Sequence, residues 1–292
     1  MFSGSLVAIV TPMRADGSID PTAWAHLIDW HIESGTSGLV IGGSTGESAT
    51  LTDAELWDLA QRTCEQARQR VAVIVGVGSS STATCVARAA RFSQLDVTGI
   101  LVVTPAYNRP TQEGLYRHFA AIAEASAKPV VAYNVPSRTA VDMLPATTGR
   151  LSQLQRMSAV KEAVPGTERV RELLAACREG FVVLSGDDAS AREAILAGAR
   201  GVISVTANVA PAAMAAMVAA ALRGEGDAAA RLDAPLAALH RDLFLEANPI
   251  PAKWALAQAG RIERGIRLPL TELSAVHQPA VLAALRQATA LQ

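Results

Sequence analysis

The sequence predicts an α/β fold, a (β/α)8 TIM barrel with a C-terminal helical extension, and three observations carry this prediction. Short β-branched apolar runs recur along the chain, amphipathic intervals of helix length separate them, and strand signals stop after Pro211. Continuous apolar runs are typical of parallel strands that are buried on both faces. Eight such units within about 210 residues match a (β/α)8 barrel, whereas open doubly wound sheets usually have fewer strands and often a nucleotide fingerprint.

Each strand is predicted from its own apolar run. In chain order the predicted strands are residues 6–10, 38–42, 71–77, 99–103, 129–134, 157–161, 181–185 and 201–205. The intervals read as helices; Thr52 and Glu55, for example, have the spacing of a capping box at a helix start. We expect a barrel catalytic domain over residues 1–224 and a C-terminal helical region over residues 225–292. This region is expected to pack on the barrel, because no polar linker separates the two.

Charge and composition limit the partners of the protein. The chain has 26 basic and 27 acidic residues, so its net charge of −1 attracts no polyanion, which argues against nucleic acid and anionic membranes as partners. The sequence shows no basic leader, and no apolar run approaches the ~20 residues that span a bilayer. Three scattered cysteines fit reduced thiols better than a disulfide framework. We therefore expect a soluble, cytoplasmic protein.

The five histidines have none of the spacings that metal ligands require, so no metal site is expected. In a (β/α)8 barrel the active site lies at the C-terminal ends of the strands. The residues that follow the predicted strands are mostly polar: Thr11, Gly42 to Glu47, Gly76 to Gly78, Thr104 to Asn108, Tyr133 to Thr139, Lys161 and Glu162, Ser185 to Asp188, and Ser204 to Asn208.

Lys161 is the strongest catalytic candidate. The chain has only three lysines; Lys128 is expected at the surface and Lys253 in a structural or surface role, but Lys161 ends an apolar strand. Burial penalises an ammonium and lowers its pKa, which yields a free amine that can form a Schiff base with a ketone. The alternative is a buried ion pair, with Glu47 or Asp187. The adjacent Glu162 is expected to point to the opposite face of the strand.

The segment from Gly42 to Glu47 could be taken for a phosphate loop, but it lacks the lysine of that motif and contains an acid. Its glycines allow close approach of a ligand to the backbone, and Ser44 and Thr45 add two hydroxyl groups. The segment is therefore either a binding loop for a small carboxylate or an ordinary tight turn.

Two of the three tyrosines, Tyr107 and Tyr133, follow predicted strands, whereas Tyr116 is expected to pack in a helix. A phenol can donate and accept protons in imine chemistry, and a hydroxyl such as that of Ser44 can pass protons between phenols. The alternative for Tyr133 is a buried ring with a satisfied hydroxyl. Arg138 follows the same strand, and it is either a binding group for a second carboxylate or a surface arginine.

Taken together, these residues resemble the dihydrodipicolinate synthase family of the pyruvate-dependent class I aldolases. The resemblance runs nearly end to end. It rests on the segments GSLVAIVTPM, GGSTGESATL, VTPAYNRPTQEGLY, YNVPSRT, VKEA, LSGDDAS, GVISVTANVAP and NPIPAKWAL, which occur in this order.

The resemblance implies a lyase of amino-acid biosynthesis that condenses pyruvate with L-aspartate 4-semialdehyde on the diaminopimelate route to lysine, without a cofactor. It implies that Lys161 forms the imine, that Tyr133 is the general acid and base, and that Ser44 and Tyr107 complete a proton relay. The second tyrosine would cross from a neighbouring subunit of a homotetramer. The implied substrate-binding residues are Thr45 for the pyruvate carboxylate, Arg138 for the semialdehyde carboxylate, and Gly186 and Ile203 in the lining of the site.

Two departures from the family pattern affect this interpretation. Ser44 stands where the synthases usually have threonine, and the Ser-Thr version also occurs in N-acetylneuraminate lyases and 2-keto-3-deoxy sugar acid aldolases, which remain the alternative activity. A barrel that only binds a ligand is a third possibility, although Lys161 and Tyr133 are both present. The residues at the positions of the lysine effector pocket differ from those of lysine-inhibited relatives, so feedback inhibition is expected to be weak or absent: Asp53, Leu56, Ser80, Thr84 and Ala106.

Overall fold

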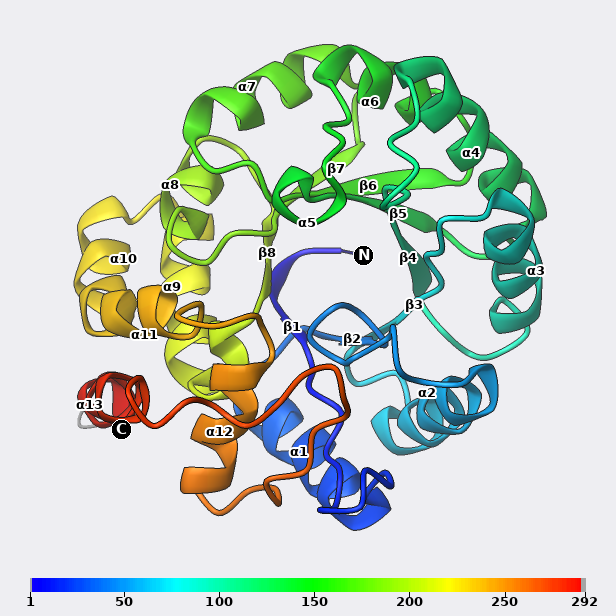
Figure 1. The fold of residues 1–292 in the computed structure, drawn as a ribbon. Helices are drawn as coiled ribbons and strands as arrows, with labels where there is room; N and C mark the ends of the chain where they lie inside the picture. The colour runs from blue at the N-terminus through cyan, green and yellow to red at the C-terminus, as the bar shows by residue number, and fades with distance from the viewer. Residues whose placement is uncertain (1, 290–292) are drawn as a thin grey trace.

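The computed structural model describes residues 2–289, and within them eight parallel strands form a closed barrel in sequence order, β1 to β8 (Figure 1). The strands are β1 (Gly4–Ala8), β2 (Gly38–Ile41), β3 (Ala72–Gly76), β4 (Gly99–Val103), β5 (Val130–Asn134), β6 (Met157–Glu162), β7 (Val182–Ser185) and β8 (Gly201–Ser204). Each predicted strand is confirmed to within two residues at either end. The predicted barrel is therefore correct in both strand number and topology.

Helices surround the strands as a ring (Figure 1). The ring consists of α1 (Pro21–Glu33), α2 (Asp53–Ala67), α3 (Thr82–Phe92), α4 (Gln112–Ala125), α6 (Pro145–Ser152), α7 (Thr167–Ala176), α8 (Ala191–Leu196) and α9 (Pro211–Leu222). Two shorter elements, α5 (Pro136–Thr139) and the 3-10 helix η1 (Thr206–Asn208), follow β5 and β8 directly. The capping box predicted at Thr52 and Glu55 is present at the start of α2.

The remaining regular elements are all helices, as predicted, although residues 259–277 form no helix or strand. They comprise α10 (Gly226–Asp233), η2 (Ala234–Leu236), α11 (Ala237–Asp242), α12 (Ile250–Gln258) and α13 (Gln278–Thr289). α10 packs against α9, and α12 contacts η1, so this region lies directly on the barrel. The division into residues 1–224 and 225–292 stays a prediction, and Met1 and residues 290–292 lie outside the described residues. Within residues 2–289, no helix has the length and apolar character that crossing a membrane requires.

Alternation along the strands separates two apolar clusters. The outer cluster lies between the strands and the helices, and it includes Val160 of β6 and Ala132 of β5. The inner cluster fills the barrel, and it includes Ala159 of β6 and Tyr133 of β5. Because side chains alternate between the two faces of a strand, Lys161 shares the inner face with Ala159, whereas Glu162 shares the outer face with Val160.

Candidate active site

A cavity of about 570 Å³ lies at the C-terminal ends of the strands. Side chains from β5, β6 and the loops after β2 and β7 line one part of it, and the segment between α11 and α12 lines another part. Ser44, Thr45, Tyr133, Arg138 and Lys161 all belong to its lining. The structure therefore brings five of the eight predicted site residues to one cavity, and Gly186 is a sixth.

Lys161 lies inside the barrel, near the end of β6, with 5 % of its surface exposed. Its register partner on β5 is Tyr133, and Lys161 Nζ lies 4.2 Å from the centroid of the Tyr133 ring. Within residues 2–289, Lys161 forms no ion pair with a carboxylate. The alternative of a buried pair with Glu47 or Asp187 is wrong, because Glu47 pairs with Lys253 and Asp187 accepts hydrogen bonds from Ser190.

The charge state of Lys161 follows from this environment. Burial lowers the pKa of Lys161 to about 8; Asp188 opposes the shift, and Arg138 adds to it. A fall from 10.5 to about 8 increases the neutral amine at pH 7 by roughly 300-fold. The amine therefore has the two properties that a Schiff-base nucleophile needs, a substantial neutral fraction and an open cavity in front of it.

Gly186 provides the space for the Lys161 side chain. A Cβ atom built on Gly186 would lie 3.0 Å from Lys161 Cε and 3.1 Å from Lys161 Cγ. A side chain at this position would require the lysine side chain to shift by a few tenths of an ångström, because these separations are shorter than ordinary van der Waals contacts. The glycine after β7 thus sets the path of the lysine toward the cavity.

Tyr133 is buried beside the amine. Burial raises the pKa of Tyr133 to about 12, against the opposing effect of Arg138, and Glu162 adds a smaller upward contribution. The phenol is consequently protonated at neutral pH and is available as a proton donor at the face of the cavity.

The loop from Gly42 to Glu47 is a tight turn whose hydroxyl groups reach the cavity, so the two alternatives from the sequence are compatible. Gly42 has a φ of +62°, and a Cβ atom there would lie 2.4 Å from Leu56 Cδ1. Thr45 is buried, and its Oγ1 accepts a hydrogen bond of 2.8 Å from Asn248 Nδ2. Since this oxygen already accepts from Asn248, the Thr45 hydroxyl proton can be donated into the cavity.

Arg138 belongs to α5, which lies inside the ring of outer helices (Figure 1). Its side chain is exposed and lines the cavity, and its NH2 group donates a hydrogen bond of 3.3 Å to the backbone carbonyl of Asn248. Arg138 is therefore a surface arginine whose guanidinium lies at the mouth of the polar cavity, so the surface position does not exclude a role in binding a carboxylate.

Two predicted site residues do not reach the cavity. Tyr107 follows β4 with a φ of +69° and is 97 % exposed. Ile203 is buried in the inner cluster of the barrel and does not belong to the cavity lining. Tyr116 packs in α4 as predicted, with the guanidinium of Arg150 at 4.1 Å from its ring centroid.

Sequence reasoning missed the contribution of the C-terminal region. Asn248 lines the cavity and contacts both Thr45 and Arg138, and Phe244 and Glu246 extend the same wall. Lys253 is buried and pairs with Glu47, so the predicted surface alternative for Lys253 is wrong. The Pro-flanked Asn248 was a signal in the sequence, but nothing near it in the chain indicated a partner some 200 residues away.

Comparisons with known proteins agree with this geometry. The Dihydrodipicolinate synthetase family matches residues 1–288. The chain is 53 % identical to the 4-hydroxy-tetrahydrodipicolinate synthase of Alkalilimnicola ehrlichii over the full length of both proteins, and 50 % identical to that of Methylococcus capsulatus, also over the full length of both. A crystal structure of chloride-inhibited dihydrodipicolinate synthase from Acinetobacter baumannii, complexed with pyruvate, has a TM-score of 0.97 and 43 % identity and covers 99 % of each chain.

Proposed function

The chain belongs to the Dihydrodipicolinate synthetase family, and from this premise we propose that Lys161 carries a 4-hydroxy-tetrahydrodipicolinate synthase reaction. The reaction condenses pyruvate with L-aspartate 4-semialdehyde on the diaminopimelate route to lysine. One observation carries the proposal: a buried amine without an ion-pair partner among the described residues faces a polar cavity beside a buried phenol. No cofactor is part of the scheme.

In this scheme the neutral amine of Lys161 attacks the keto carbon of pyruvate. The carbonyl oxygen leaves as water after proton transfers, and a C=N bond replaces the C=O bond. Tyr133 is the proton donor and acceptor for this step. Its ring, whose centroid lies 4.2 Å from Lys161 Nζ, supports this role, and its raised pKa supports its part as donor. Thr45 holds the pyruvate carboxylate with its hydroxyl and backbone N-H groups.

The second half of the scheme uses the imine as an electron sink. Loss of a proton from the methyl carbon gives an enamine, which bonds to the aldehyde carbon of the semialdehyde. The aldehyde C=O bond opens, its oxygen takes up a proton to become a hydroxyl group, and the C=N bond to Lys161 forms again. The amino group of the semialdehyde then attacks the imine carbon, closes the ring and releases the amine of Lys161. Arg138 binds the carboxylate of the semialdehyde, which its guanidinium at the mouth of the cavity supports.

We propose that Tyr107, Ile203 and Gly186 act in the same site in different ways. Gly186 provides the space for Lys161, and Ile203 supports the floor of the barrel below it. Tyr107 completes the proton relay with Ser44 from a neighbouring subunit of a homotetramer. Its 97 % exposure at a strand end supports a role at a contact between subunits. The three free cysteines, Cys64, Cys85 and Cys177, support a cytoplasmic location.

Trapping with borohydride tests the proposed covalent step. Incubation with pyruvate and borohydride should add the mass of the reduced pyruvate imine to the peptide that contains Lys161. A protein that remains unmodified would refute the proposal. Turnover of pyruvate with the semialdehyde, compared with turnover of N-acetylneuraminate and of 2-keto-3-deoxy sugar acids, separates the synthase from the alternative aldolases.

Replacement of Arg138 tests the binding of the second substrate. Arg138→Ala should raise the KM for the semialdehyde by roughly 10- to 100-fold, the range expected for a hydrogen bond to a charged group, and should change the KM for pyruvate much less. Equal changes in both KM values would reject the assignment of Arg138 to the semialdehyde carboxylate.

A further inference from the structure

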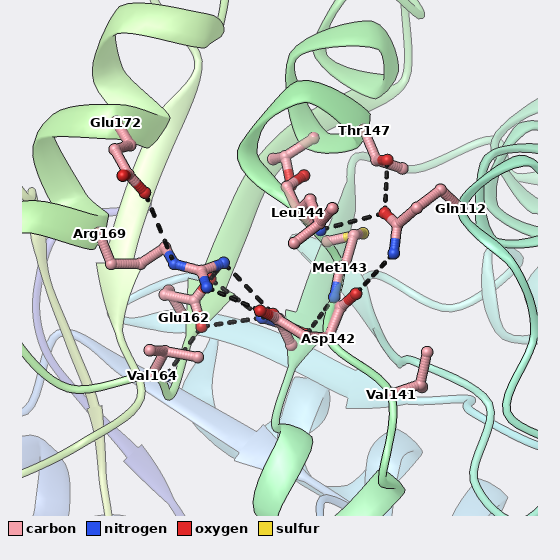
Figure 2. Close-up of polar contacts among 12 residues, drawn as sticks. Gln112, Val141, Asp142, Met143, Leu144, Thr147, Glu162, Val164, Arg169 and Glu172 are labelled. Carbon is pink, nitrogen blue, oxygen red and sulfur yellow. Dashed lines mark hydrogen bonds and ion pairs between the residues drawn. The ribbon is translucent and has the colours of Figure 1, made fainter.

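A buried polar cluster lies behind the cavity, on the outer face of β5 and β6. We call it the outer polar cluster; it consists of Asn134, Asp142, Glu162 and Arg169. Figure 2 shows Arg169 extending from α7 toward Asp142 and Glu162. None of these side chains belongs to the lining of the cavity, so the proposed chemistry does not use them directly.

The Asn134 amide is at the centre of the cluster. Its Nδ2 donates hydrogen bonds to Glu162 Oε1 at 3.0 Å and to Asp142 Oδ1 at 2.7 Å, and its Oδ1 accepts one from the Met143 backbone at 2.9 Å. Glu162 Oε1 also accepts a hydrogen bond from the Val164 backbone at 2.8 Å. The cluster therefore links β5, β6 and the loop between α5 and α6 through directional bonds.

Arg169 is shared between the two carboxylates of the cluster, and it also lies 3.9 Å from Glu172, which is outside the cluster. It donates two hydrogen bonds to Asp142, at 2.7 and 3.2 Å, and its NH1 lies 3.8 Å from Glu162 Oε2. With one guanidinium for two carboxylates, the cluster is not fully neutralised. Burial raises the pKa of Glu162 to about 7, although the hydrogen bonds from Val164 and Asn134 and the charge of Arg169 oppose the rise. Burying these charged groups costs desolvation free energy that apolar side chains would not require. The hydrogen bonds of the cluster therefore serve to orient the strands and the loop rather than to stabilise the fold.

The register of the strands connects this cluster to the cavity. Tyr133 pairs with Lys161, and the next pair along the same ladder is Asn134 with Glu162. Both strands end at this second pair, and one more backbone hydrogen bond follows it, from the Ala163 N-H to the Asn134 carbonyl at 3.0 Å. The side-chain bond between Asn134 and Glu162 adds a second link at the same pair, on the face opposite the cavity and one residue beyond the proposed phenol and amine.

The cluster also holds the segment that carries Arg138. Asp142 and Met143 lie four and five residues after Arg138, and both are bonded to Asn134. Gln112 of α4 holds the other side of this loop, because its side chain donates to the Asp142 carbonyl at 2.7 Å and accepts from Leu144 at 3.1 Å (Figure 2).

We propose that the outer polar cluster positions the imine chemistry: Glu162 and Asn134 hold Tyr133 and Lys161 in register from the opposite face of the two strands. This inference rests on the function proposed above. Glu162 and Asn134 are positioning residues, since they touch neither the cavity nor the substrate. Loss of the cluster should slow imine formation without weakening the binding of pyruvate.

The test compares Glu162→Gln with Glu172→Gln. Glu172 is a matched control, because its side chain is 51 % exposed and lies 3.9 Å from the same Arg169, and within residues 2–289 it forms no hydrogen bond or ion pair with β5 or β6. Glu162→Gln should lower the rate of borohydride-trapped adduct formation, measured at saturating pyruvate, by 10-fold or more, with the KM for pyruvate within twofold of the wild-type value. Glu172→Gln should leave both values unchanged.

A double-mutant cycle separates positioning from simple destabilisation. If Glu162 acts through Tyr133, the variant that combines Tyr133→Phe with Glu162→Gln should be no more than twofold slower than Tyr133→Phe alone. Fully multiplicative effects, or an unchanged adduct rate in Glu162→Gln, would overturn the inference. Asn134→Ala, which removes the link from the other strand, should give the same kinetic result and replaces Glu162→Gln if that variant fails to fold.

The reaction of the wild-type protein separates a failure of the proposed function from a failure of the positioning role. If wild-type protein forms no adduct with pyruvate, the proposed function itself fails. If wild-type protein forms the adduct and both Glu162→Gln and Asn134→Ala form it at the wild-type rate, only the positioning role is wrong.

Discussion

Lys161 and Lys253 are both buried, but only Lys161 belongs to the lining of the cavity. Their exposed fractions are 5 % and 4 %. Lys253 pairs with the buried carboxylate of Glu47, whereas Lys161 has the cavity and the ring of Tyr133 in front of its amine. Burial lowers the pKa of both; at Lys253 the attraction of Glu47 opposes the shift, and at Lys161 the pKa reaches about 8.

This difference shows that burial alone does not make a lysine reactive. A carboxylate in contact stabilises the ammonium form and occupies the position from which a substrate would approach. The pairing at Lys253 serves the loop that carries Thr45: Glu47 holds a left-handed backbone conformation with a φ of +57°, and its second oxygen accepts a hydrogen bond from the Arg267 backbone. Lys253 therefore has a buried carboxylate partner, whereas the Lys161 amine has none among residues 2–289.

The largest expected effect is on activity when Lys161 is replaced. Lys161→Met should lower turnover by a factor on the order of 10³ or more, because the covalent path is lost. Its free energy of unfolding should be unchanged or higher, since an unpaired buried amine is removed. Urea denaturation beside a turnover assay measures both. A large loss of stability in Lys161→Met would contradict the contrast with Lys253.

Replacement of Lys253 should have its main effect on stability. Lys253→Met leaves Glu47 buried without its partner and should lower the free energy of unfolding by about 3–5 kcal/mol. Adding Glu47→Gln should recover part of this loss. At saturating pyruvate the single variant should still form the adduct on Lys161. Equal stability of the single variant and the wild type would show that the pair does not hold the loop.

The smallest effect concerns pH. Only the neutral amine attacks, so adduct formation should be roughly fivefold faster at pH 8 than at pH 7 and should level off above about pH 9. The folded pKa of Lys161 lies below the unfolded value of 10.5, so the contribution of Lys161 to stability is lowest below pH 8 and rises between pH 8 and 10.5. Rates of borohydride trapping across this range measure the first effect. A rate independent of pH would argue that the amine is neutral throughout.

Much of the site could be predicted from local patterns. The strand positions follow from short apolar runs, and the inward direction of Lys161 follows from alternation along β6. The outward direction of Glu162, also predicted, is confirmed by its bond to Asn134. The exposure of Tyr107 and the absence of Ile203 from the cavity lining could not be predicted, because each depends on how loops and side-chain layers pack around the barrel.

The sequence by itself determined the barrel and the inner face of each strand, because period-two alternation and helix-length spacing are local properties of the chain. The place of Lys161 at the end of an apolar strand is also local, and it made this residue the candidate nucleophile. Only the tertiary structure decided which carboxylate pairs with which lysine. Glu47 and Lys253 are 206 residues apart, and Asn248 reaches Thr45 across 203 residues. Such contacts depend on where the C-terminal region packs against the closed barrel, and no local pattern contains that information.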